Sequence, residues 1–151
     1  MAHPLLSAMH FNVLVVDDSA VMRAMIVRTL RMSGLPLGDV HEAANGAEAL
    51  DRLRQAWVDL MLLDINMPIM NGEQVVEHLR ADPETADLKV VVVSTEGSDT
   101  RVSRLAAQGV AFVHKPFTPE QLRDTVLRVT GISHEQAAAA HRAGAGDDVD
   151  F

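Results

Sequence analysis

The chain of 151 residues contains no cysteine, no tyrosine and only one tryptophan. The absence of cysteine excludes disulfide bridges, thiolate metal sites and cysteine nucleophiles. Aromatic residues make up only 3% of the chain, and 13 basic residues against 21 acidic ones give a net charge of −8. Such a composition favours neither base stacking nor binding to a phosphate backbone. We therefore expect no direct nucleic-acid partner.

Long hydrophobic runs are also missing. The N-terminal stretch has no region rich in Lys or Arg and is interrupted by Ser7, His10 and Asn12, so we expect no signal peptide. No apolar run approaches the roughly 20 residues of a membrane span. We therefore expect a cytoplasmic protein without membrane insertion, whose length suits one domain with a substantial core.

What the chain does contain is a series of short apolar runs rich in branched residues, which is typical of buried strands in a parallel sheet. Strands are predicted at residues 13–16, 40–44, 60–63, 90–93 and 110–114. His41 and Glu42 make the second of these polar, which suits a strand at the edge of the sheet. Trp57, just before the third strand, is expected to be a packing residue.

Segments with helical periodicity alternate with these strands, at residues 19–32, 47–55, 73–80, 99–108 and 118–130. Thr118 is the predicted N-cap of the last helix and Pro119 its first residue. In the first helix the expected apolar stripe consists of Val21, Met22, Met25, Ile26 and Leu30. Right-handed crossovers then predict an α/β fold, a single doubly wound five-stranded parallel sheet.

A carboxylate follows the central strand directly. Asp64 comes after four apolar residues, and Met67-Pro68 and Asn71-Gly72 prevent the chain from continuing straight into a helix. This places Asp64 at the carboxyl edge of the sheet, where open α/β sheets bind their ligands. The alternative is that Asp64 only caps the next turn.

Other polar residues follow the remaining strands. Asp17 and Asp18 follow the first, Ser94 the fourth and Lys115 the fifth, so the topology brings them to the same edge as Asp64. Each of these residues also has a purely structural interpretation. The aspartates would cap the following helix, the Ser94 hydroxyl would hydrogen-bond to nearby backbone groups, and Lys115 would be a solvated side chain. Three close carboxylates favour a bound Mg²⁺, which takes oxygen ligands and phosphate, and Lys115 can pair with phosphoryl oxygens.

The pattern over about residues 13–130 resembles the receiver domain of two-component response regulators of the chemotaxis type. The features that carry the resemblance are Asp-Asp after the first strand, Asp after the third, Ser-Thr after the fourth and Lys-Pro after the fifth. The resemblance implies a flavodoxin-like strand order 2-1-3-4-5. It also implies that Asp64 accepts a phosphoryl group from a sensor histidine kinase, and that the protein performs only self-catalysed phosphoryl transfer and autodephosphorylation.

The resemblance further assigns the metal site and its surroundings. Mg²⁺ would be contacted by Asp18, Asp64 and the backbone carbonyl of Asn66, with Asp17 acting through water. The Lys115-Pro116 peptide bond would be cis. Asn66 and Glu96 would tune dephosphorylation, as would Thr95, which is bulkier than the residue typical at its position.

A conformational switch is implied as well. Ser94 would move toward the phosphoryl group and Phe112 would swing inward, remodelling the face formed by the fourth helix, fifth strand and fifth helix for a downstream protein. Chemotaxis-type relatives carry Tyr in place of Phe112, which argues against partner contacts that need this hydroxyl. We expect a monomer.

Four other functions are alternatives to this interpretation. A phosphatase of the haloacid dehalogenase type needs a second Asp where this chain has Asn66, and a flavodoxin-type flavin carrier needs aromatic residues that are scarce here. A phosphate sink and a phosphorelay intermediate share the receiver pattern and stay open.

We predict an N-terminal extension at residues 1–11, a receiver domain at residues 12–131 and a tail at residues 132–151 that is partly helical or disordered. The alanine-rich residues 134–142 are a candidate extension of the last helix. The acidic residues 144–151 are interpreted as a frayed tail, or alternatively as a segment that docks on the receiver and tunes partner access. The tail is too short for an output domain, so a stand-alone receiver is expected.

Overall fold

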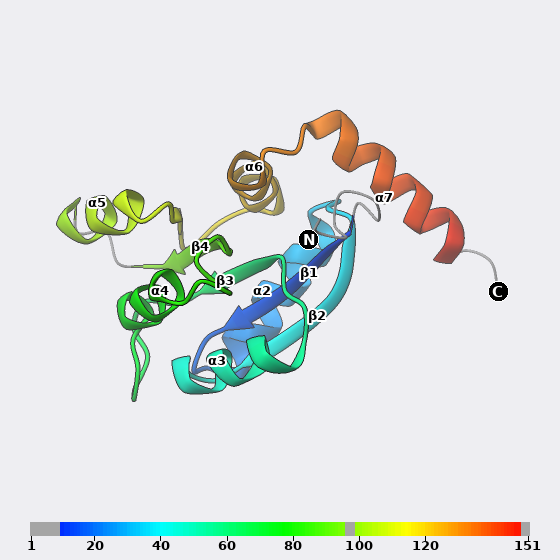
Figure 1. Ribbon diagram of the computed structural model, residues 1–151. Coiled ribbons are helices and arrows are strands. Elements are labelled where there is room, and N and C mark those ends of the chain that lie inside the picture. Colours follow the sequence, from blue (N-terminus) through cyan, green and yellow to red (C-terminus); the bar gives the residue numbers. More distant parts are fainter. Residues whose placement is uncertain (1–9, 96–98, 149–151) are drawn as a thin grey trace.

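The computed structural model describes residues 10–95 and 99–148. The strands are β1 (Phe11–Val16), β2 (Leu37–Ala43), β3 (Leu60–Leu63), β4 (Lys89–Ser94) and β5 (Ala111–His114). The helices are α2 (Ala20–Met32), α3 (Gly46–Gln55), α4 (Gly72–Ala81), α5 (Asp99–Ala107), α6 (Pro119–Thr130) and α7 (His134–Asp148). Strands and helices alternate along the chain up to α6, as the hydrophobic pattern predicted (Figure 1).

All five strands are parallel and lie in the order β2-β1-β3-β4-β5. This confirms the doubly wound sheet and the predicted strand order. The central strand β3 pairs with β1 on one side and β4 on the other, with Val16 opposite Leu63 and Leu63 opposite Val92. The strands therefore end nearly level, and the loops that follow β1, β3 and β4 meet at one edge of the sheet.

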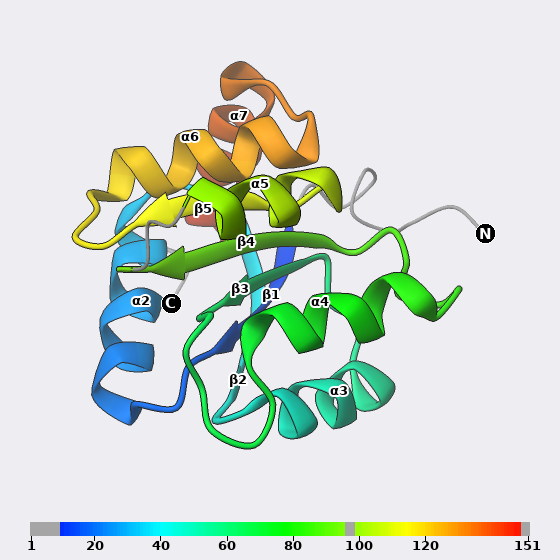
Figure 2. The same ribbon diagram turned by 90° about the vertical axis from the view of Figure 1, so that its left-hand side faces the viewer.

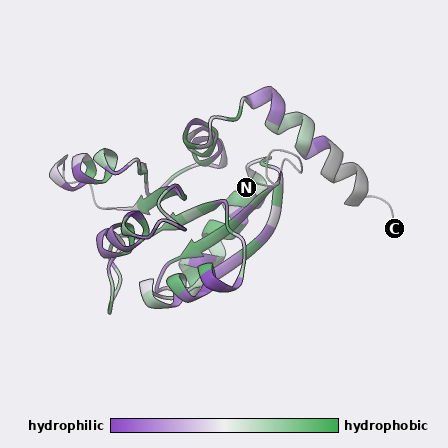
Figure 3. Cartoon of the chain, in the orientation of Figure 1, coloured by the Kyte–Doolittle hydropathy of each residue, from purple (hydrophilic) through white to green (hydrophobic). Residues whose placement is uncertain are grey.

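Two hydrophobic layers cover the two faces of the sheet, because successive residues of a strand point to opposite sides. In β1, Val13 and Val15 belong to the layer under α2 and α6, while Leu14 and Val16 belong to the layer under α3, α4 and α5. Figure 2 shows these helices around the sheet, and in Figure 3 the central strands are predominantly coloured as hydrophobic. All four residues of β3 are buried, so Asp64 is the first polar residue that the strand delivers.

The predicted helix starts agree closely with the structure. The Thr118 hydroxyl accepts a hydrogen bond from the backbone N–H of Gln121, and Pro119 is the first residue of α6. The predicted second strand is different, because β2 begins three residues earlier, at Leu37. The polar stretch at its start is held in the sheet by Asn12, whose side-chain oxygen accepts a 2.8 Å hydrogen bond from the backbone N–H of Asp39.

Two expectations about packing were wrong. Val21 and Met25 are 74% and 56% exposed, because the stripe of α2 that contacts the sheet is narrow and centres on Ile26 and Leu30. Trp57 is 53% exposed rather than packed. Its indole N–H donates a 2.7 Å hydrogen bond to Oδ1 of Asp59, so the ring lies at the surface with its polar end satisfied.

The residues after α6 form a separate helix rather than an extension of α6. Gly131 adopts a left-handed conformation with φ of 74°, and its N–H donates to the Leu127 carbonyl, which ends α6. A new helix, α7, then runs from His134 to Asp148. Ala137 of α7 is buried against the α2/α6 layer. Residues 149–151 lie outside the described residues, so docking of the acidic tail stays a prediction.

Candidate functional site

The candidate site lies at the carboxyl edge of the sheet, where the loops after β1, β3 and β5 converge with the end of β4. The backbone bonding of the sheet continues into these loops. The N–H of Asp64 donates to the Val16 carbonyl at 3.0 Å, and the N–H of Lys115 donates to the Ser94 carbonyl at 3.1 Å. These bonds fix the starting points of the site's side chains relative to one another.

Three carboxylates from two loops gather at this edge. Oxygen atoms of Asp17, Asp18 and Asp64 all lie within 4.8 Å of one another. Asp17 is buried, Asp64 is partly buried and Asp18 is exposed. A set of hard oxygen donors that is open to solvent on one side suits a cation such as Mg²⁺, which keeps several of its waters when it binds. The donor set therefore fits the predicted metal.

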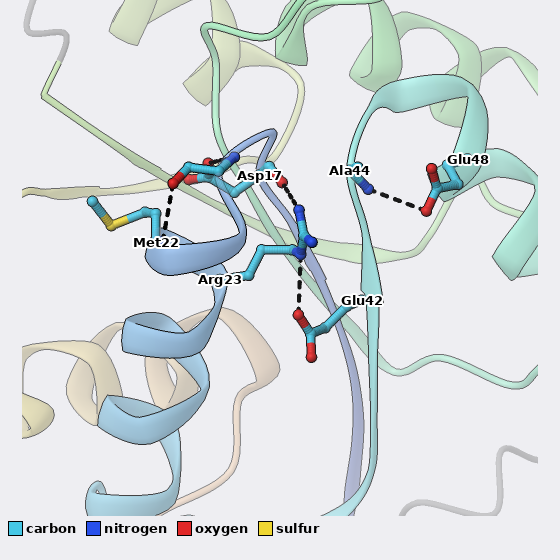
Figure 4. Close-up of polar contacts among 7 residues, drawn as sticks. Asp17, Met22, Arg23, Glu42, Ala44 and Glu48 are labelled. Atoms are coloured by element: carbon cyan, nitrogen blue, oxygen red, sulfur yellow. Dashed lines mark hydrogen bonds and ion pairs between the residues drawn. The ribbon is translucent and has the colours of Figure 1, made fainter.

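Asp17 is held at each of its polar atoms. Its Oδ1 accepts a 2.9 Å hydrogen bond from the N–H of Ser19, and its Oδ2 lies 3.3 Å from Nζ of Lys115. Its own N–H donates to the Ala43 carbonyl at 3.1 Å, and its carbonyl accepts a 2.6 Å hydrogen bond from Nη1 of Arg23. Figure 4 shows the contact between Arg23 and Asp17. A single rigid geometry for the buried Asp17 carboxylate follows from these contacts.

Burial raises the pKa of Asp64 above its ordinary value, and this is the largest influence on it. The charges of Asp17 and Asp18 raise this pKa further, whereas the Lys115 ammonium and the N–H of Asn66 lower it. The Asn66 N–H lies 3.4 Å from Oδ1 of Asp64. Desolvation of Asp64 therefore contributes more to its raised pKa than repulsion among the carboxylates does.

The remaining predicted residues occupy different environments. Ser94 is buried at the end of β4, and Thr95, the next residue, is exposed. Glu96 lies outside the described residues. Phe112 is partly buried, and its ring meets that of His114 edge to face with centroids 4.9 Å apart. The Lys115-Pro116 peptide bond is cis, as the resemblance implied.

The loop between β3 and α4 approaches Asp64 closely. The N–H of Gly72, the first residue of α4, donates a 2.8 Å hydrogen bond to the Ile65 carbonyl. A Cβ atom on Gly72 would lie 2.6 Å from the Asp64 carbonyl oxygen. Only glycine allows this approach, so Gly72 places the start of α4 against the backbone that carries Asp64.

Sequence reasoning missed two residues of the site. It interpreted Gly72 only as part of a turn, and it did not single out Arg23. The pattern at Gly72 gave a partial signal, since glycine is expected where two backbones approach closely. Arg23 gave none, because a single arginine on a helix is usually a solvated side chain.

A groove of about 640 Å³ lies at the opposite, amino-terminal edge of the sheet. Trp57, Asp59 and Leu88 are among the residues that line it. Trp57 and Asp59 precede β3, and Leu88 precedes β4, whereas Asp64 and Ser94 lie at the far ends of these strands. The groove is therefore separate from the carboxylate cluster.

Within the described part of the chain, no helix is long and apolar enough to cross a membrane.

Comparison with known proteins gives a consistent result. Residues 13–127 match the family described as the response regulator receiver domain. The chain is 39% identical over 130 residues to a chemotaxis protein CheY homolog of Campylobacter jejuni, covering 85% of this chain and 98% of that protein. It is 39% identical over 122 residues to chemotaxis protein CheY1 of Helicobacter pylori, covering 80% and 97%. The structure of Vibrio cholerae chemotaxis protein CheY4 has a TM-score of 0.70 at 35% identity, covering 80% of this chain and 98% of that chain.

Proposed function

The chain belongs to the response regulator receiver domain family, and from this premise we propose that Asp64 is its phosphorylation site. One observation carries the proposal. Asp64 is the partly exposed member of the aspartate cluster on which the Lys115 charge acts, whereas the Asp17 carboxylate is buried and already bonded to Ser19 and Lys115. Its position at the end of the buried central strand leaves its carboxylate only partly covered and open to a donor.

The proposed reaction is transfer of a phosphoryl group from a phosphohistidine of a sensor histidine kinase. An oxygen of ionised Asp64 attacks the phosphorus, so that an O–P bond forms as the P–N bond of the phosphohistidine breaks. The electron pair of the broken bond stays on the imidazole nitrogen. Lys115 favours the ionised, nucleophilic form of Asp64, because its charge opposes the effect of burial on the pKa.

The metal ligands are proposed as Asp18, Asp64 and the backbone carbonyl of Asn66, with Asp17 acting through water. When Mg²⁺ is bound, it offsets the negative charge of the carboxylates and of the incoming phosphoryl oxygens. Lys115 would supply a second positive charge near Asp64. Phosphorylation adds about −1.5 to −2 charges at this edge, so both cations are needed to hold the product.

The output is proposed to be binding of a downstream protein by the monomer in the cytoplasm. Ser94 would donate its hydroxyl to the phosphoryl group, and Phe112 would move inward beside it. The surface that changes is the face of α5, β5 and α6, which contains Phe112. Relatives named as chemotaxis proteins support a chemotaxis-type role, while the missing hydroxyl at Phe112 favours apolar over polar partner contacts. Asn66, Thr95 and Glu96 are the proposed determinants of the dephosphorylation rate.

Intact-mass measurement tests the proposed site. The protein is incubated with acetyl phosphate and Mg²⁺, beside the Asp64→Asn variant and an Asp51→Asn control in the exposed part of α3. We expect one phosphoryl adduct on the wild type and the control, none on Asp64→Asn, and none on the wild type when a chelator is present. An adduct that persists on Asp64→Asn would overturn the assignment.

A second experiment separates the proposed output from a phosphate sink or relay intermediate. The phosphorylated protein is mixed with the purified kinase of its own cell and with that cell's histidine phosphotransfer proteins. Return of the phosphoryl group to another histidine would indicate a sink or relay. Retention on Asp64 together with new binding of a target to the α5-β5-α6 face would support the proposed output.

A further inference from the structure

Arg23 connects the acidic loop after β1 to the edge strand β2. Its Nη1 donates a 2.6 Å hydrogen bond to the Asp17 carbonyl, and its Nε donates a 3.0 Å hydrogen bond to Oε1 of Glu42 (Figure 4). The Arg23 side chain is 17% exposed, so much of this contact is shielded from water, while Glu42 is 51% exposed. A planar guanidinium can serve both acceptors at once in a fixed geometry.

The peptide groups on both sides of the Asp17 Cα are linked to two neighbouring residues of β2. The N–H of Asp17 donates directly to the Ala43 carbonyl of β2, and the Asp17 carbonyl is tied through Arg23 to Glu42 of β2. The peptide group between Asp17 and Asp18 is planar. Fixing its carbonyl therefore also fixes the direction of the N–H and Cα of Asp18.

Asp18 depends on this backbone restraint. Its side chain is exposed and forms no hydrogen bond or ion pair with the residues that the structure describes. The carboxylate of Asp17, in contrast, is fixed by Ser19 and Lys115. The orientation of Asp18 toward the other two carboxylates is thus set by the Asp17–Asp18 peptide, and Arg23 is the side chain that holds that peptide.

We propose that Arg23 is a positioning residue that sets the Mg²⁺ affinity of the carboxylate cluster by holding the Asp17–Asp18 peptide in place. This inference rests on the proposed function, because it takes the cluster to be the Mg²⁺ site. In the described part of the chain, Arg23 bonds to the Asp17 carbonyl and to Glu42 rather than to any of the three clustered carboxylates. It acts through the backbone that carries Asp17 and Asp18.

The charge of Arg23 and its positioning role change the Mg²⁺ affinity in opposite directions, which makes the inference testable. Arg23 is a positive charge near a cation site, so its field alone weakens Mg²⁺ binding. Removing the charge without any loss of positioning would strengthen binding. Loss of positioning weakens it, and supporting contacts around metal ligands typically contribute about 10-fold or more to affinity.

The experiment measures Mg²⁺ binding directly, without phosphorylation. MgCl₂ is titrated into the full-length, ¹⁵N-labelled protein at constant ionic strength, and the shifts of the backbone amide signals give the dissociation constant. We expect Arg23→Met to bind Mg²⁺ about 10-fold more weakly than the wild type. Arg28→Met, an exposed change of the same kind on α2, serves as the matched control and should bind with unchanged affinity.

Arg23→Lys is the second variant, and it keeps the charge. Lysine has one compact ammonium, which cannot bridge the Asp17 carbonyl and Glu42 as the guanidinium does, so we expect a weaker affinity here too, whereas the field alone predicts no change. Circular dichroism checks that each variant is folded. The Mg²⁺ affinity of either folded variant then tests the role of Arg23. Equal or tighter Mg²⁺ binding by the folded variants overturns the role of Arg23 and leaves the proposed function intact. Absence of Mg²⁺ binding by the wild type instead overturns the proposed metal site and this inference with it.

Discussion

Nζ of Lys115 lies 3.3 Å from Oδ2 of Asp17, although the two residues are 98 positions apart in the chain. Their strands, β5 and β1, are not neighbours in the sheet, because β4 and β3 lie between them. The lysine side chain therefore reaches across the ends of two strands, and Asp64 follows one of these. Both side chains are shielded from water, with 14% of Lys115 and 2% of Asp17 exposed. One cation is thus shared between the buried Asp17 and the proposed nucleophile.

Replacement of this lysine is expected to raise the pKa of Asp64 further. Lys115 is the strongest influence that lowers this pKa, so in Lys115→Met the effects of burial and of the neighbouring carboxylates are less opposed. The pKa is measured by following the Asp64 carboxyl signal with pH in ¹³C NMR. Lys89→Met is the matched control, since Lys89 is exposed at the start of β4. An unchanged Asp64 pKa in Lys115→Met would show that the ammonium does not act on Asp64.

The raised pKa of Asp64 predicts how stability depends on pH. The folded protein holds this proton more tightly than the unfolded chain, whose reference value is 3.8. Ionisation of Asp64 therefore costs folding free energy, and the cost appears as the pH rises from below 3.8 through the raised folded pKa. Without Mg²⁺, Asp64→Asn should be more stable than the wild type at neutral pH.

Urea denaturation followed by circular dichroism checks this second prediction. The stability difference between Asp64→Asn and the wild type should shrink when the pH is brought well below 3.8, where Asp64 is protonated in both states. Addition of Mg²⁺ at neutral pH should stabilise the wild type more than the variant. A difference that stays constant with pH would contradict the assignment of the cost to Asp64 ionisation.

Gly72→Ala is expected to damage both the fold and the site. The added Cβ would lie 2.6 Å from the Asp64 carbonyl oxygen and 2.8 Å from Cα of Ile65, and backbone atoms cannot move aside easily. We expect a loss of about 2 kcal/mol in the free energy of unfolding and slower phosphorylation by acetyl phosphate.

Gly34→Ala provides the control for this change. Gly34 has φ of +81° and nothing within 4 Å of an added Cβ, so the substitution costs backbone energy without contact with the site. The expected loss is about 1 kcal/mol, with phosphorylation at the wild-type rate. Equal phosphorylation rates for the two variants would argue against a role of the Gly72 approach in placing Asp64.

Asp59 is expected to stabilise the opposite edge of the sheet. Its carboxylate is buried and accepts hydrogen bonds from the N–H of Asn12 at 2.8 Å and from the indole of Trp57 at 2.7 Å. Asp59→Ala leaves these donors without this acceptor, which should cost about 1–3 kcal/mol in chemical denaturation. Asp51→Ala, which removes an exposed ion pair with Arg54, should change stability by less than about 1 kcal/mol. Similar losses for both would contradict the importance of burial at Asp59.

Much of the fold could be predicted because its signals are local. Leu60–Leu63 is uniformly apolar, as a strand covered on both faces must be, and its predicted bounds agree with those of β3. The N-cap at Thr118 was predicted for a similar reason, since capping depends on a few adjacent residues. The exposure of Val21, Met25 and Trp57 was not predicted, because apolar residues on a helix do not reveal how wide a face the sheet covers.

The sequence by itself determined which chemistry is present and in what order along the chain. It places acidic residues after the first and third strands, a hydroxyl after the fourth and a lysine after the fifth, and alternation of strands and helices brings them to one edge. This follows from local periodicity and from the handedness of crossover connections. Only the tertiary structure decided which of these groups touch. Lys115 pairs with Asp17, Arg23 holds the Asp17 carbonyl, and burial dominates the pKa of Asp64. Distances and desolvation depend on how distant segments pack, and no local pattern in the chain encodes them.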